Sequence, residues 1–352
     1  MRSILAGALV TLLLSSSSNA HAIINGTPSP EEHDFVVQLA YTKGGERVAH
    51  CSGTVVAKRL VLTARHCVGE VSADDSTVAD FKPSILEVVT GRDASKRVLE
   101  SGPPDAKGAK LFVPKTTSLI PDVAVVLVDT DLDTPIAQLR LDSGVVKNES
   151  LDLVGYGLTE EGVYPPARLQ RTGVKVFSLG PSESRFFDIA QSEYVLGEAA
   201  CSGDSGGPAL SSKTGAVVGV ASRVANGKDP KSIPLSSFCL GDVVENVYGD
   251  LTLAKPLLDE AFAEASAEPW LEGQDPPKPK SEASSSGSSG SAPADSGCSV
   301  TTARSASSLA DVALGLLVAL GLLVVRASRI GDGSAKSEMR EGATRARLSR
   351  DR

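Results

Sequence analysis

Hydrophobic residues along most of the chain fall in short runs that are separated by glycine, proline, aspartate and asparagine. This pattern extends from Ile23 to about Val247. Short runs rich in valine and leucine, bounded by turn-forming residues, are typical of the strands of β-sandwiches and β-barrels. We therefore expect an all-β domain whose strands include Phe35–Tyr41, Thr54–Val56, Leu60–Thr63, Val123–Val128, Leu151–Val154 and Ala216–Ala221.

A helical period occurs near the end of this region. Apolar residues recur there at spacings of three and four, which places them on one face of an α-helix. The pattern predicts one terminal helix that packs on the β domain, with its apolar face formed by Leu257, Leu258, Ala261, Phe262 and Ala265.

The composition changes after Glu268. Residues 269–308 contain Pro276–Pro279 and the Ser/Gly-rich stretch Ser281–Ser291. Such a segment cannot bury enough apolar surface to fold, so we predict a disordered linker.

Residues 309–325 are apolar apart from Asp311, and the tail over 326–352 is basic. The length is near the minimum for a transmembrane helix, and the flanking arginines favour a cytoplasmic C-terminus. A buried amphipathic helix is the alternative, but no polar stripe is visible. We therefore predict a single hydrophobic helix that associates with a membrane.

The first 22 residues have the features of a signal peptide. Arg2 provides a positive start, Ile4–Leu14 is apolar, and Ala20-His21-Ala22 is an A-x-A cleavage site. The alternative, a membrane anchor, needs a longer apolar run. We predict secretion or attachment to the cell surface, and such compartments permit disulfides.

Charge and cysteine content narrow the function further. The net charge of −8 argues against nucleic-acid binding. Four of the five cysteines lie in the predicted domain and the fifth lies in the linker, which suggests two disulfides and one cysteine with a separate role. The five are Cys51, Cys67, Cys201, Cys239 and Cys298.

The motif Gly203-Asp204-Ser205-Gly206-Gly207-Pro208 is the strongest local signal of catalysis. It also matches G-x-S-x-G, the nucleophile elbow of α/β-hydrolases, whose histidine follows the serine in the chain. Here every histidine precedes Ser205, and alternating helices are missing from the pattern, so the α/β-hydrolase interpretation fails. The four histidines are His21, His33, His50 and His66.

His66 is the favoured general base. A serine hydroxyl needs such a base to become nucleophilic, and the base is usually histidine. His66 follows an apolar run and precedes Cys67, whereas His21 leaves with the signal peptide and His33 lies among charged residues. A carboxylate at Asp122 begins a buried apolar strand, and an imidazole N–H is a suitable partner for it. The alternative is that Asp122 merely starts the strand.

These residues resemble the motifs of the chymotrypsin–trypsin family of serine proteases (peptidase S1). The matching segments are Cys51–Gly53, Thr63–Cys67, Asp122–Val126, Gly155–Gly157 and Gly203–Pro208. The resemblance implies two six-stranded antiparallel β-barrels over residues 23–268, with the terminal helix, and a monomeric serine endopeptidase that acts on proteins or peptides. A protease-fold binding module without activity, or an esterase, are the alternatives.

The resemblance also assigns roles. It implies a triad of His66, Asp122 and Ser205, with the N–H groups of Gly203 and Ser205 as the oxyanion hole. It implies disulfides Cys51–Cys67 and Cys201–Cys239. No cofactor or metal is predicted; an acidic loop that could hold calcium is interpreted as solvated, and it contains Glu70, Asp74, Asp75 and Asp80.

In this family a new N-terminus pairs with the aspartate that precedes the catalytic serine. Ile23-Ile24-Asn25-Gly26 resembles that N-terminus, and Asp204 is the expected partner. Cleavage after Ala22 would expose Ile23 directly, and cleavage after Ala20 would require further trimming.

Specificity is predicted from three positions. Ala199 is expected at the pocket floor, and Ser222 and Val224 are expected on the substrate-binding strand. Alanine in place of an acid, and valine in place of glycine, predict small aliphatic side chains at P1, the residue before the scissile bond. Arg65 and Arg223 depart from the family pattern, and we expect both near the site.

The C-terminal region resembles a sorting tag of the MYXO-CTERM kind, found in bacterial proteins. Cys298 would then be the processing or attachment site, although a plain membrane anchor is the alternative.

Overall fold

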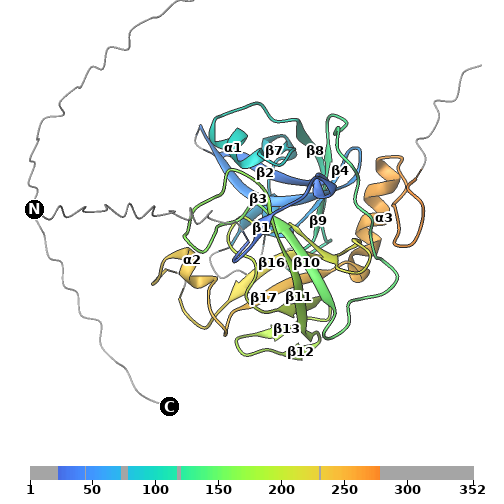
Figure 1. The fold of residues 1–352 in the computed structure, drawn as a ribbon. Coiled ribbons are helices and arrows are strands. Elements are labelled where there is room, and N and C mark those ends of the chain that lie inside the picture. The colour runs from blue at the N-terminus through green and yellow to red at the C-terminus, as the bar shows by residue number, and fades with distance from the viewer. Residues whose placement is uncertain (1–22, 44, 73–77, 117–119, 230, 278–352) are drawn as a thin grey trace, which may run out of the picture. The chain divides into compact units, whose positions relative to one another are not determined.

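The computed structural model describes residues 23–277, except 44, 73–77, 117–119 and 230 (Figure 1). The predicted signal peptide, the apolar stretch 309–325, Cys298 and the basic tail lie outside the described residues. Among the helices of the described part, none is long and apolar enough to cross a membrane.

The first half of the described chain forms a closed antiparallel barrel. Its strands pair in the order β2-β3-β4-β9-β8-β7. Figure 1 shows this barrel in the upper half of the ribbon. The strands are β2 (Val36–Lys43), β3 (Glu46–Ala57), β4 (Leu60–Thr63), β7 (Leu86–Val89), β8 (Ala106–Phe112) and β9 (Ala124–Val128).

The second half forms another closed barrel, in the order β11-β10-β15-β16-β17-β14, and β14 pairs back with β11. The register of β11 shifts between Val176 and Ser178, and such an irregularity bends a strand so that it can pair on both sides of a closing barrel. The strands are β10 (Ser150–Gly155), β11 (Leu169–Leu179), β14 (Glu193–Leu196), β15 (Pro208–Ser211), β16 (Val217–Ala225) and β17 (Glu245–Asp250).

Short elements connect and extend the barrels. β1 (Thr27–Pro28) pairs with β11, β5 (Gly69–Val71) with β6 (Val78–Asp80), and β12 (Ser182–Glu183) with β13 (Asp188–Ile189). The helices are η1 (Glu31–His33), η2 (Arg65–Val68), η3 (Pro83–Ile85), α1 (Ala94–Leu99), α2 (Leu235–Phe238), η4 (Thr252–Ala254) and α3 (Lys255–Glu264).

The predicted fold is confirmed: two six-stranded barrels and a terminal helix. The apolar face of α3 packs on the core of the first barrel, and Leu258, Ala261 and Phe262 are buried there. Burying a side chain of the size of leucine or phenylalanine contributes about 1.5–3 kcal/mol relative to leaving it exposed.

The body of the domain extends past the predicted start of the linker at Pro269. Leu139 donates its N–H to the Trp270 carbonyl at 2.7 Å, and Glu272 donates its N–H to the Leu139 carbonyl at 2.8 Å. The Glu272 carboxylate also accepts two hydrogen bonds from Arg140. Residues 270–274 are therefore part of the folded domain, because their backbone pairs with the connection between the barrels.

A fully buried arginine joins the start of the domain to β11. Arg168 donates to Ser29 Oγ at 3.1 Å, to the Pro30 carbonyl at 2.9 Å and to the Asp34 carboxylate at 2.8 Å. Nothing in the sequence pattern indicated this role, because its partners come from a segment far away in the chain.

Candidate active site

His66 lies in η2, directly after β4. Cys67 forms a disulfide with Cys51 of β3, so the turn that carries the imidazole is covalently joined to the neighbouring strand. The His66 side chain is about one-fifth exposed, which leaves the ring reachable from solvent.

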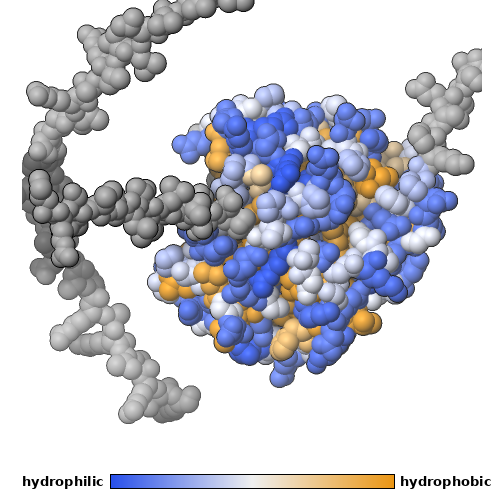
Figure 2. Space-filling model, viewed as in Figure 1, coloured by the Kyte–Doolittle hydropathy of each residue, from blue (hydrophilic) through white to orange (hydrophobic). Residues whose placement is uncertain are grey.

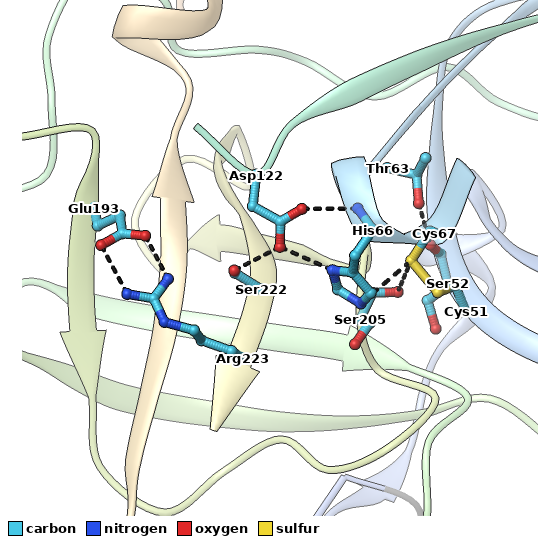
Figure 3. Close-up of polar contacts among 10 residues, drawn as sticks. All are labelled: Cys51, Ser52, Thr63, His66, Cys67, Asp122, Glu193, Ser205, Ser222 and Arg223. Atoms are coloured by element: carbon cyan, nitrogen blue, oxygen red, sulfur yellow. Dashed lines mark hydrogen bonds and ion pairs between the residues drawn. A yellow bond between two sulfur atoms is a disulfide. The ribbon is translucent and has the colours of Figure 1, made fainter. Parts of the chain in front are cut away.

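Asp122 is buried and lies directly behind the His66 ring (Figure 3). His66 Nδ1 is 2.8 Å from Asp122 Oδ2, and the His66 backbone N–H donates to Oδ1 at 2.9 Å. Ser222 Oγ donates to Oδ2 at 2.6 Å. Burial alone would raise the pKa of Asp122, but the His66 ring, these hydrogen bonds and Ser222 together hold that pKa below its ordinary value.

Ser205 approaches the same imidazole from the second barrel. Cys67 Sγ lies 3.8 Å from His66 Nε2 and 3.6 Å from the Ser205 carbonyl oxygen, so one sulfur atom contacts both residues. Ser52 donates its N–H to the Ser205 carbonyl at 2.8 Å. Figure 3 shows Ser205 next to the His66 ring, with Asp122 and Ser222 on the other side. The three residues of the predicted triad are brought together.

The loop before Ser205 turns at a position that favours glycine. Gly203 has φ +98°, a conformation that residues with a side chain rarely adopt. A Cβ atom there would lie 2.9 Å from both Gly157 Cα and the Tyr164 ring. Ser52 Oγ donates to the Gly203 carbonyl at 2.9 Å and accepts from the Tyr156 N–H at 3.1 Å. The sequence pattern did not indicate this role of Ser52.

Asp204 is fully buried beside this loop. Its carboxylate accepts hydrogen bonds from the N–H groups of Gly157 at 2.8 Å and Cys201 at 2.9 Å. Burial raises the pKa of Asp204 to about 7, because the two hydrogen bonds only partly offset the loss of solvent.

The segment that begins at Ile23 is docked in the same region. Ile23 and Ile24 are buried, and Ile24 donates its N–H to the Ala199 carbonyl at 2.8 Å. Glu198 accepts from Asn25 Nδ2 at 3.0 Å and from the Gly241 N–H at 2.6 Å. This glutamate therefore connects the N-terminal segment with the loop after the second disulfide, and the sequence contained no signal for it.

A cavity of about 130 Å³ opens beside Ser205. The Cys201–Cys239 disulfide lies in its wall. Val224 lines the cavity as predicted, whereas Ala199 is buried in the core of the second barrel and Ala200 takes the lining position. The Ser222 hydroxyl binds Asp122, so this residue supports the triad through its side chain. The lining residues are Ala200, Cys201, Ser202, Ser205, Ala221, Ser222, Arg223, Val224, Leu235, Phe238, Cys239, Asn246, Val247 and Tyr248.

The two arginines that were expected near the site behave differently. Arg65 lies beside His66 in η2, as expected, but its side chain is buried, pairs with Asp80 at 2.6 Å and does not line the cavity beside Ser205. Arg223 forms a two-pronged ion pair with Glu193, and its guanidinium lies 5.0 Å from the centre of the Phe187 ring.

One group of potential metal ligands occurs in the described part of the chain. It consists of Cys51, His66 and Cys67, whose donor atoms lie within 4.8 Å of one another. The two sulfur atoms are bonded to each other and offer no thiolate, so the group does not fit a metal ion. In the acidic loop, Asp74 and Asp75 lie outside the described residues.

Two closed antiparallel barrels with a histidine, an aspartate and a serine where they meet define the chymotrypsin-like serine protease fold. The sequence model of the trypsin family matches residues 23–237, and the chain belongs to that family.

Three relatives show how far the similarity extends. Hypodermin-A of Hypoderma lineatum is 28% identical over 57% of this chain and 77% of its own length. Trypsin alpha-4 of Lucilia cuprina is 28% identical over 53% and 72%. A trypsin of Saccharopolyspora erythraea is 27% identical over 51% and 76%.

Proposed function

We propose that this protein is a secreted serine endopeptidase with His66, Asp122 and Ser205 as its triad. The observation that carries the proposal is the pairing of His66 with the buried Asp122 while Ser205 lies next to the same ring (Figure 3). Its Nδ1 faces the buried Asp122 carboxylate at 2.8 Å, and its Nε2 faces the sulfur that also contacts Ser205.

The reaction would proceed in two acyl-transfer steps. His66 Nε2 takes the proton from Ser205 Oγ, which attacks the scissile carbonyl carbon and forms a tetrahedral oxyanion. The imidazolium returns the proton to the departing amine, leaving an acyl ester on Ser205. Water, activated by the same imidazole, then releases the acid and regenerates the hydroxyl. The buried negative charge of Asp122 orients the ring and stabilises its protonated form.

The N–H groups of Gly203 and Ser205 would bind the oxyanion. The positive φ of Gly203 supports this role, since it turns the backbone in a way that a side chain would oppose. A donor of this kind stabilises the transition state by about 3 kcal/mol.

Activation would follow cleavage before Ile23. The new ammonium group would pair with Asp204, which compensates the cost of keeping that carboxylate charged in the interior. The docked Ile23–Asn25 segment and the burial of Asp204, which its two backbone hydrogen bonds only partly offset, support this step. N-terminal sequencing of the secreted protein tests it, and a mature start at any residue other than Ile23 contradicts it.

The substrate preference would be a small aliphatic P1 residue. Val224 narrows the cavity, and among the described residues that line it none is an aspartate or glutamate. Cleavage of a peptide library chiefly after arginine or lysine would contradict this preference.

Labelling with a fluorophosphonate tests the proposed function directly. We expect stoichiometric labelling of the mature protein, loss of labelling in Ser205→Ala, and turnover of peptide amides as well as esters. An unlabelled mature protein would instead indicate a binding module, and turnover of esters alone would indicate an esterase. Fractionation of cells tests the predicted secretion and the membrane association through residues 309–325.

A further inference from the structure

A short helix forms one wall of the cavity beside Ser205. α2 lies between β16 and Cys239, and its C-terminal end is held by two contacts. The Cys201–Cys239 disulfide joins its C-terminal end to the loop before Ser205. Asn226, which is buried and follows β16, donates from Nδ2 to the carbonyl of Phe238, the last residue of α2, at 2.8 Å. The position of α2 is therefore set by a covalent bond and a buried hydrogen bond.

The two ends of α2 present large apolar side chains to the cavity. Phe238 is 8% exposed and Leu235 is 45% exposed, although both line the same space as Ser205. Figure 2 shows hydrophobic residues at the surface in the region where Figure 1 labels α2. An apolar substrate group that covers the half-exposed Leu235 side chain would remove apolar surface from water, which is favourable.

The charged and amide groups that line the cavity already have partners within the protein. The Arg223 guanidinium is engaged by Glu193 and Phe187, and the Asn246 amide donates to the Gly197 carbonyl at 2.9 Å. A cationic or anionic P1 group entering this space would lose its hydration without gaining a counterion.

We propose that Leu235 and Phe238 are specificity-determining residues that select a branched aliphatic P1 side chain. Leu235 would be covered by the substrate and contribute contact area, while Phe238 would limit the depth and exclude aromatic rings. This inference rests on the proposed endopeptidase activity and adds to it a selecting element that lies outside the substrate-binding strand.

The test is a series of peptide substrates that differ only at P1, with Ala, Val, Leu, Phe or Arg. We expect Leu235→Ala to lower kcat/KM about fivefold to twentyfold for P1 Val and Leu and less than twofold for P1 Ala, since lost apolar contact is the only change. Phe238→Ala should raise the ratio of kcat/KM for P1 Phe over P1 Ala at least fivefold.

Leu253→Ala is the matched control. Leu253 is 48% exposed in η4 and lines a different groove, so its removal should leave the P1 ranking unchanged. Each preparation is normalised by fluorophosphonate titration, which removes any effect of misfolded protein. Unchanged P1 ratios in both α2 variants would overturn the inference, as would a wild-type preference for Arg. Failure of the wild type to label would instead overturn the proposed function.

Discussion

Gly206 packs so closely against Thr63 that no side chain fits between them. A Cβ atom on Gly206 would overlap Thr63 Oγ1 and the Ser52 carbonyl, and it would lie 3.0 Å from the Ala64 nitrogen. Gly206 follows Ser205, and Thr63 ends the strand that leads to His66. The absence of a side chain at Gly206 therefore lets the serine loop of one barrel come close to the histidine turn of the other.

Gly206→Ala is expected to reduce labelling and kcat/KM more than 100-fold, because the serine loop must move away from His66 to admit the methyl group. Gly215→Ala is the matched control. Gly215 also has a positive φ, of +75°, but a Cβ there meets nothing within 4 Å. The control should lose about 1 kcal/mol of folding stability and retain activity. Urea unfolding and active-site titration separate the two effects, and equal losses of activity would contradict this account.

Ser222→Ala is expected to lower kcat/KM about tenfold. The hydroxyl donates to Asp122 Oδ2 at 2.6 Å, and a hydrogen bond to a buried charge contributes about 1.5–3 kcal/mol. Without this hydrogen bond the Asp122 carboxylate is held less firmly behind the His66 ring, so the imidazole is oriented less well. Ser222→Thr keeps a hydroxyl and should restore most of the activity. A pH–rate profile of the three proteins is the measurement.

The uncleaved precursor is expected to lose stability as pH rises from about 4 to 7. The folded-state pKa of Asp204 is about 7, above the ordinary unfolded value of about 3.9, so the folded form binds the extra proton in this interval. The loss is on the order of 4 kcal/mol at most and is complete above the folded pKa. Asp204→Asn should abolish this component in unfolding experiments across the pH range.

The mature protein provides the contrast for that experiment. A free Ile23 ammonium beside Asp204 would lower the pKa of this carboxyl and remove the loss of stability toward neutral pH. Identical pH dependence in the precursor and the mature protein would contradict the pairing.

Glu198→Ala is expected to lower the fraction of titratable active sites in the mature protein. Glu198 binds Asn25 and the Gly241 N–H, so its removal loosens both the N-terminal segment and the loop next to the pocket disulfide. We expect about a tenfold loss of kcat/KM with a smaller change in the unfolding midpoint. Glu161→Ala, an exposed position, is the control. Full activity in Glu198→Ala would show that the segment docks without this contact.

The sequence by itself determined an all-β domain and a short set of candidate residues, and its resemblance to the chymotrypsin–trypsin family added the two barrels and the cysteine pairing. Short apolar runs, the turn residues between them and the order of His66, Asp122 and Ser205 can all be read directly along the chain. The terminal helix over Lys255–Glu264 was visible for the same reason, since its apolar face repeats at helical spacing.

Only the tertiary structure decided which distant groups complete the site. Ser222 was predicted on the substrate-binding strand and lines the cavity, but the sequence did not show that its hydroxyl also binds Asp122. Arg65 was expected near the site and lies beside His66, but its side chain is buried against Asp80. The short helix α2 contributes Leu235 to the pocket wall. These outcomes depend on how two barrels approach each other and on which face of a strand turns inward. Both depend on packing between segments that are far apart in the chain, so they cannot be inferred from the residues next to Ser222, Arg65 or Leu235 in the sequence.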